Sequence, residues 1–197
     1  MLDPLHAEEI EEALTAVGEL LAALGERHAI VVVGGATMNL LGFVRRSTSD
    51  VDVIARAHRD ELGELRLEPA EPFPPALDRA IRTAARDLWL DEGWMNAVVG
   101  AQWKRGLPPG MTGDITWRTY GEGLDVGLAG RRTLIALKLF AAADAAPGSV
   151  HTQDLLALRP TDEELEHAAE WVRTQDEAPQ WASLLAEVIA HVKRSRS

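Results

Sequence analysis

The feature that most constrains this chain is a short apolar run that ends in two glycines and is soon followed by paired aspartates. The run is Ala29–Val33, and its isoleucine and valines are typical of a buried strand. Gly34 and Gly35 follow at once, where a backbone without Cβ atoms can turn tightly and expose its N–H groups. Asp50 and Asp52 come after a polar link, with one valine between them. Because side chains alternate along a strand, both carboxylates are expected on one face.

Two carboxylates this close repel each other unless a positive group lies between them. A divalent cation is the usual group, and hard oxygen ligands favour Mg²⁺. The exposed backbone of the glycine pair and the start of the following helix can hold an anion. Transfer of a nucleotidyl group from a nucleoside triphosphate needs both a phosphate cradle and metal-binding carboxylates. The sequence therefore predicts Asp50 and Asp52 as metal ligands, with Gly34, Gly35 and Ser49 positioning phosphate.

Each part of this pattern has an ordinary alternative. A glycine pair after a strand is usually a turn, and Asp-x-Asp is usually a solvated strand face. Their order and spacing together favour the functional interpretation. Arg45 and Arg46 are expected within reach of the triphosphate, although an ordinary polar loop explains them equally well.

The rest of the chain reads as an alternation of helices and strands. The predicted fold is α/β or α+β, with a small mixed sheet that carries the aspartates and a C-terminal helical half. We expect a nucleotidyltransferase-type core over residues 1–130 and a helical part over 131–197, packed as one unit. Helices are predicted over 4–24, 36–41, 77–90, 132–145, 151–158, 161–173 and 181–193. Strands are predicted over 29–33, 50–55, 114–120 and 123–130. Residues 66–76 are predicted to form a loop.

Lys138 lies within a strongly apolar helix, so its ammonium group must snorkel to solvent, pair with an acid or bind an anion such as a triphosphate. Its removal is expected to weaken nucleotide binding with little loss of stability, because the helix keeps its apolar packing. Asp154 begins the next predicted helix. There it either favours the helix dipole or supports the site by orienting Lys138 or the acceptor hydroxyl.

The pattern of apolar strand, Gly-Gly, helix and Asp-x-Asp resembles the polymerase-β-like nucleotidyltransferase superfamily. RRTLIALKLFAAAD and HTQDLLAL are similar to the Lys helix and the Asp helix of AbiEii-type toxins, among them the mycobacterial MenT toxins. The segment GWMNAVVGAQWKRGLPPGM resembles a Trp-x-Asn element of the same group. The resemblance covers roughly residues 28–175.

This resemblance implies a Mg²⁺-dependent toxin that transfers nucleotides from a nucleoside triphosphate to the 3′ end of tRNA and blocks translation. It implies that Lys138 binds the triphosphate, that Asp154 belongs to the active site, and that a cognate antitoxin is a partner. Many members of the superfamily carry a third metal-binding carboxylate. The candidates are Asp114 and Asp125, and neither has convincing context.

Composition limits the alternatives. A net charge of −11 argues against a general nucleic-acid coat protein and leans toward a second possibility, a small-molecule nucleotidyltransferase that modifies cationic antibiotics. A third possibility is a non-catalytic module that keeps the nucleotidyltransferase fold and binds a partner. The chain has no cysteine, no apolar run of the ~18 residues that span a bilayer, and no basic signal region at its start, so we expect a cytoplasmic protein without a membrane partner.

Two further expectations concern the surroundings of the aspartates. Arg79, Arg82 and Arg86 form a basic stripe on one helix, which is either an RNA-binding face on the side of Asp50 or a solvated surface. A phosphate on Ser47, Thr48 or Ser49 would add roughly −1.5 to −2 charges beside the carboxylates and oppose nucleotide entry. We therefore predict that the antitoxin phosphorylates or covers this link, the alternative being a simple turn.

Overall fold

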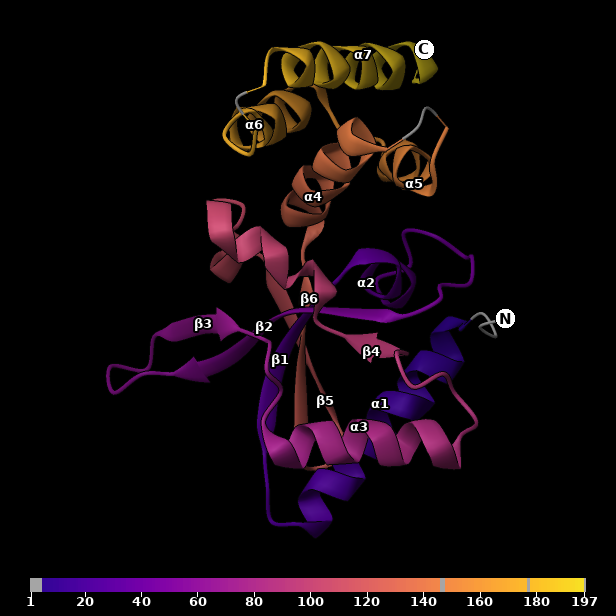
Figure 1. Ribbon diagram of the computed structural model, residues 1–197, viewed down its shortest axis with the longest axis vertical. Coiled ribbons are helices and arrows are strands. Elements are labelled where there is room, and N and C mark those ends of the chain that lie inside the picture. Colours follow the sequence, from indigo (N-terminus) through magenta and orange to yellow (C-terminus); the bar gives the residue numbers. More distant parts are fainter. Residues whose placement is uncertain (1–4, 146–147, 177, 197) are drawn as a thin grey trace. The chain divides into compact units, whose positions relative to one another are not determined.

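A six-stranded mixed sheet organises the part of the chain that carries the aspartates in this computed structural model (Figure 1). The strand order is β3-β2-β1-β6-β5, and β4 pairs with β2 beside this path. β1 and β6 are parallel, whereas β2 runs antiparallel to both β1 and β3. The α/β fold class predicted from the sequence is confirmed. The strands are β1 (His28–Val33), β2 (Val51–Arg59), β3 (Leu65–Pro69), β4 (Met95–Asn96), β5 (Ile115–Tyr120) and β6 (Leu124–Ala129).

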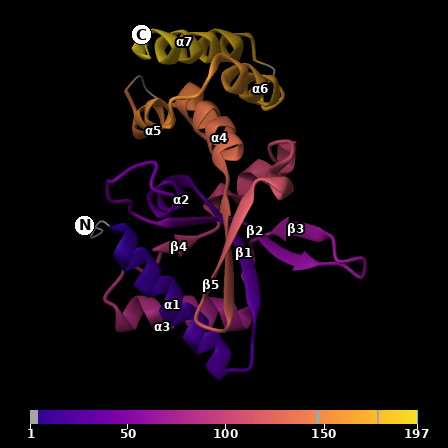
Figure 2. The same ribbon diagram turned by 180° about the vertical axis from the view of Figure 1, so that it is seen from behind.

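Three helices accompany this sheet: α1 (Ala7–Ala23), α2 (Gly34–Leu40) and α3 (Pro75–Asp87). α1 and α3 pack against each other, as Figures 1 and 2 show from opposite sides. α1 places its apolar residues three or four apart, so they form one stripe that is fully buried. That stripe joins the inner side chains of α3 and the central strands in one hydrophobic core, which holds β1 and β2 in place.

The C-terminal helices form a group of their own: α4 (Arg131–Asp144), α5 (Val150–Leu158), α6 (Asp162–Arg173) and α7 (Pro179–Ser195). α4 contacts each of the other three. Phe140 packs against Trp171 and Trp181, with ring centroids 6.1 and 5.4 Å apart. Thr161 caps α6 and exchanges hydrogen bonds with Glu164 in a capping box. The predicted helices of this half are confirmed to within about two residues.

The structure describes residues 5–145, 148–176 and 178–196, and the chain divides into two compact units. The first runs to residue 103 and takes in 115–129, and the second comprises 104–114 together with the chain from residue 130 onward. From the sequence we expected residues 104–114 to belong to the nucleotidyltransferase-type core. In the structure this segment falls in the second unit, and Asp114 at its end accepts hydrogen bonds from the backbone N–H groups of Arg132 and Thr133, at the start of α4.

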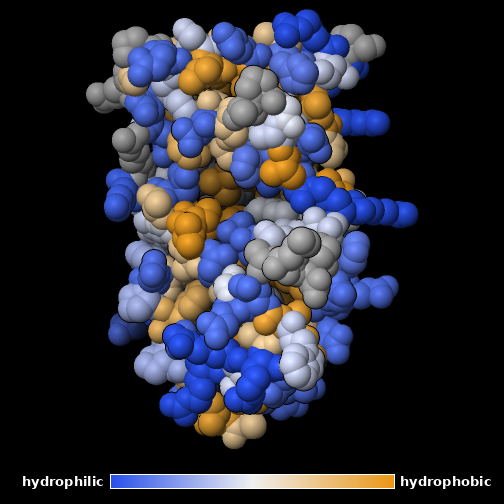
Figure 3. All heavy atoms as spheres, turned by 45° about the vertical axis from the view of Figure 1, so that its right-hand side comes forward, coloured by the Kyte–Doolittle hydropathy of each residue, from blue (hydrophilic) through white to orange (hydrophobic). Residues whose placement is uncertain are grey.

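Hydrophilic residues predominate on the face in Figure 3, and the hydrophobic areas there are small and scattered. Within the described ranges, the helices are all too short or too polar to cross a membrane.

Candidate active site

The glycine pair and Asp52 lie against each other. Val33, the last residue of β1, pairs with Asp52 on the neighbouring strand β2, so Gly34 emerges beside the Asp52 carboxylate. Gly34 has a φ of 73°, a conformation that favours glycine. A Cβ atom added at this position would collide with Oδ2 of Asp52. The sequence therefore needs glycine here both for the turn and for the close approach of the carboxylate.

Gly35 gives the same kind of room to the link before Asp50. A Cβ atom at Gly35 would lie 2.6 Å from Oγ1 of Thr48 and 3.6 Å from Nη2 of Arg46. Arg46 is half-buried, and its Nη1 donates to the carbonyl of Ser47 at 3.0 Å. The structure thus brings the Arg46 guanidinium next to the start of α2, whereas Arg45 is exposed.

The three hydroxyl residues of the link differ in exposure. Thr48 is buried, and its backbone exchanges hydrogen bonds with that of Leu5 at 2.7 and 2.9 Å. Ser47 is half-buried and Ser49 is exposed. Ser49 Oγ donates to Oδ1 of Asp50 at 3.2 Å. Of the three predicted phosphorylation positions, Ser49 is therefore the most accessible and lies beside a carboxylate. Its modification stays a prediction, which mass spectrometry of the protein from its own cell would test.

Asp50 also contacts a residue that sequence reasoning did not assign to the site. Nδ2 of Asn96 donates to Oδ2 of Asp50 at 3.3 Å. The pairing of β4 with β2 sets Asn96 opposite Asp52. The only sequence signal for this residue was its place in the Trp-x-Asn element, which gave no hint of the contact.

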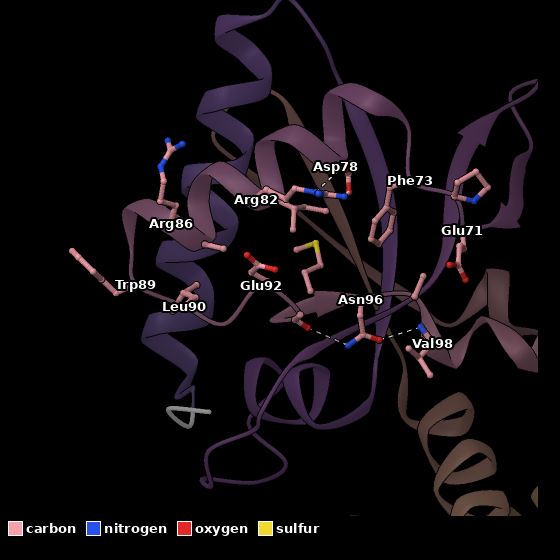
Figure 4. Close-up of a pocket in the computed structure, with 16 residues that line it drawn as sticks. Glu71, Phe73, Asp78, Arg82, Arg86, Trp89, Leu90, Glu92, Asn96 and Val98 are labelled. Atoms are coloured by element: carbon pink, nitrogen blue, oxygen red, sulfur yellow. Dashed lines mark hydrogen bonds and ion pairs between the residues drawn. The ribbon is translucent and has the colours of Figure 1, made fainter. Parts of the chain in front are cut away.

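Asn96 also lines a hollow of about 1160 Å³ on the first unit, next to α3 (Figure 4). Arg82 and Arg86 of the basic stripe line it as well, and Arg79 does not. Trp89 projects outward beyond the end of α3 in Figure 4, and the residue is 89% exposed. Two of the three arginines thus share a hollow with a residue that touches Asp50.

Lys138 and Asp154 form a buried ion pair within the second unit. Nζ of Lys138 lies 2.7 Å from Oδ2 of Asp154, and the side chains are 8% and 1% exposed. Of the three outcomes considered for Lys138, the structure shows pairing. The predicted orienting contact between Asp154 and Lys138 exists, and a role of either residue toward a triphosphate stays a prediction.

The two candidates for a third carboxylate have structural partners. Asp114 holds the start of α4, and Asp125 pairs with Arg27 at 2.9 Å and accepts a hydrogen bond from Thr119. Asp125 lies opposite Ala29, near the start of β1, whereas Asp52 lies opposite Val33 at its end. In the described part of the chain, no three His, Asp or Glu side chains are grouped so that they could hold a metal ion.

The residues present nevertheless fit Mg²⁺. This cation is usually held by one or two carboxylates, with substrate phosphates and water supplying the other oxygens. Asp50 and Asp52 supply two partly buried carboxylates, and the glycine at position 34 keeps the space beside one of them free of a side chain. A pair of ligands rather than a full protein cage is therefore compatible with this metal.

Gly34→Ala tests this close approach, with Gly42→Ala as a matched control. Gly42 has a φ of 76°, and no atom lies within 4 Å of an added Cβ. Both variants should lose about 1–2 kcal/mol of folding stability, because alanine is strained at positive φ. Only Gly34→Ala should also displace Asp52 and lose metal binding, measured by Mn²⁺ titration. Equal Mn²⁺ affinity in the two variants would show that the contact does not matter.

Comparison with known proteins bears on this same region. Residues 12–72 match the model of a family described as "Nucleotidyltransferase of unknown function (DUF6036)". The matched segment contains β1, the glycine pair and both aspartates. The comparison therefore supports the nucleotidyltransferase superfamily, and the narrower resemblance to AbiEii-type toxins stays a prediction.

The chain is also similar in structure to an antigenic nucleotidyltransferase-like protein from Paracoccidioides brasiliensis. The identity is 14%, the TM-score is 0.42, and the match covers 93% of this chain and 95% of the other. No curated protein matches the chain.

Proposed function

We propose that the chain transfers a nucleotidyl group from a nucleoside triphosphate to a hydroxyl group, with Asp50 and Asp52 as ligands of Mg²⁺. The observation that carries this proposal is the close approach of the Asp52 carboxylate to Gly34, directly after the last residue of β1, where an added Cβ atom would collide with Oδ2 of Asp52. It puts the half-buried backbone of Gly34, which is proposed to bind phosphate, next to a carboxylate, which suits the metal. When bound, Mg²⁺ supplies charge neutralisation at the phosphates and at the attacking oxygen.

The residues of the chain then have distinct tasks. The Gly34-Gly35 backbone is proposed to bind the phosphates, and Arg46 supplies a positive charge next to Gly35. Arg45, which is exposed, is proposed to reach the same phosphates. Asp50 and Asp52 hold the cation. Lys138, paired with Asp154, is proposed to add positive charge to the triphosphate.

As acceptor we propose the 3′ hydroxyl of an RNA, with tRNA as the expected substrate. Arg82, Arg86 and Trp89 line the hollow that Asn96 shares, and arginines with an exposed aromatic ring suit a phosphate backbone and an unstacked base. Such an activity would block translation, so the chain would act as a toxin with a cognate antitoxin. That part of the proposal rests on the resemblance to the toxins alone.

One observation favours a second candidate, a small cationic acceptor. Arg82 pairs with Asp78 at 3.1 Å and Arg86 with Asp87 at 3.0 Å, so each arginine already has a carboxylate partner. Glu71 and Glu92 also line the hollow, and neither has an ion pair among the described residues. Exposed ion pairs are worth only about 0–1 kcal/mol, so an RNA phosphate could displace the aspartates, but the unpaired glutamates attract a cation instead.

The two candidates are separated by one labelling experiment. The protein is incubated with Mg²⁺ and each labelled nucleoside triphosphate in turn, either with total RNA or with aminoglycosides, and the labelled product is identified. Label in tRNA supports the first candidate, and label in the aminoglycoside supports the second. Absence of label from both contradicts the proposed acceptors.

If RNA is labelled, Arg82→Gln/Arg86→Gln should weaken its binding. The dependence of log affinity on log salt should flatten by about one for each phosphate that the double variant no longer binds. Arg173→Gln is the matched control, because Arg173 is an exposed arginine paired with Glu166 on the second unit. An unchanged salt dependence in the double variant would exclude this hollow as the RNA site.

A further inference from the structure

The Asp50 carboxylate is held at both of its oxygen atoms. Ser49 Oγ donates to Oδ1 at 3.2 Å, and Asn96 Nδ2 donates to Oδ2 at 3.3 Å. Both donors are neutral, so they fix the direction of the carboxylate without cancelling its charge. Each oxygen keeps a lone pair for a further partner. The two donors differ in rigidity, because Ser49 is exposed on the link and Asn96 belongs to the sheet.

The backbone that carries Asn96 is firmly anchored. Two residues earlier, Trp94 is 1% exposed, and its Nε1 donates to the carbonyl of Ile81 at 3.3 Å. The carbonyl of Trp94 accepts the N–H of Val51 at 2.6 Å. The short strand β4 is thereby tied on one side to α3 and on the other to β2, which begins directly after Asp50.

The direction of the Asn96 amide is fixed as well. Its Oδ1 accepts a hydrogen bond from the backbone N–H of Val98 at 3.0 Å, so the amide oxygen must face Val98 (Figure 4). The NH₂ group must then face Asp50 and the carbonyl of Gly93, at 3.4 Å. The hydrogen-bond network thus leaves one amide orientation that satisfies all three contacts.

We propose that Asn96 is a positioning residue for the metal-binding Asp50, holding its carboxylate in the orientation that a divalent cation needs. The inference deepens the proposed function and rests on it. Residues that hydrogen-bond a metal ligand orient it before the metal arrives, and their loss typically costs about 10- to 100-fold in metal affinity or activity. Asn96 meets this description from a strand outside the Asp-x-Asp segment.

Asn96→Ser is the sharpest test. A serine hydroxyl can still accept the N–H of Val98, as serine does in turns of this kind, but it is too short to reach Asp50. The variant should therefore keep its thermal unfolding temperature while its hydrogen bond to the carboxylate disappears. We expect Mn²⁺ binding, followed by electron paramagnetic resonance with a non-hydrolysable nucleoside triphosphate present, to weaken about 10- to 100-fold.

Thr119→Ala is the matched control. Oγ1 of Thr119 donates to the Asp125 carboxylate at 2.7 Å, so this variant also removes a neutral donor from an aspartate on the sheet. It should leave Mn²⁺ affinity unchanged. Asn96→Ala, which also removes the acceptor for Val98, serves as a second variant and should bind Mn²⁺ at least as weakly as Asn96→Ser.

The outcomes separate the inference from the proposed function. If the wild-type protein binds no Mn²⁺, both the proposed metal site and the proposed role of Asn96 are contradicted. Wild-type binding that Asn96→Ser and Asn96→Ala leave unchanged contradicts the role of Asn96 and leaves the metal site standing. Weakened binding in a folded Asn96→Ser protein, with normal binding in Thr119→Ala, supports the inference.

Discussion

Asp52→Asn should reduce nucleotidyl transfer by at least about a thousandfold, because a lost metal ligand removes several kcal/mol of charge stabilisation from the transition state. The side chain keeps its shape and loses its charge, which also relieves the repulsion between Asp52 and Asp50. The fold should therefore survive, with Gly34 still packed against the amide. Two measurements on the same preparation check this prediction. Transfer of label from the nucleoside triphosphate reports the loss of activity, and thermal unfolding reports whether the fold survives.

Asp125→Asn is the control for this variant. Asp125 is a partly buried aspartate on the same sheet, next to the other end of β1. It should keep full activity. A fully active Asp52→Asn protein would contradict the proposal that this site transfers nucleotidyl groups.

Lys138→Met should destabilise the protein by about 3–5 kcal/mol, because it leaves the buried carboxylate of Asp154 without its ammonium partner. From the sequence we expected little loss of stability, since the helix keeps its apolar packing. The buried ion pair predicts a larger loss instead, because the charge of this lysine is paired inside the protein. The sequence shows an apolar helix around Lys138, but not which acid folds against it.

The double variant Lys138→Met/Asp154→Leu separates the structural role of the pair from a functional one. Replacing both charges by apolar groups should restore most of the lost free energy of unfolding, measured by urea denaturation. Triphosphate affinity is then measured on a folded protein. If it equals that of the wild type, Lys138 is a structural residue only, and if it is lost, the ammonium contributes to nucleotide binding.

Elements with a strong local pattern were predictable from the sequence. The apolar run of β1, the stripe on α1 and the capping box at Thr161 each specify their element through neighbouring residues. The same holds for the glycine pair beside β1 and the aspartates at the start of β2. In these segments, local propensity and the final packing agree.

Elements that depend on distant partners were not predictable. Residues 66–69 were expected to lie in a loop because of their proline and acidic residues, yet they belong to the edge strand β3, where polar residues and proline are tolerated. The two-residue strand β4 exists only through its pairing with β2. The contact of Asn96 with Asp50 joins residues 46 positions apart, so no local pattern could indicate it.

The position of β1 in the sheet determines which truncated fragments of the chain can fold. β1 is flanked by β2 and by β6, and β6 comes from residues 124–129, far beyond the segment that matches the family model. A fragment that stopped at residue 103 would leave one side of β1 with unpaired N–H and C=O groups, and a bare central strand of this kind invites aggregation. A fragment for expression that is meant to carry the aspartates must therefore extend through Ala129, and residues 104–114 come with it.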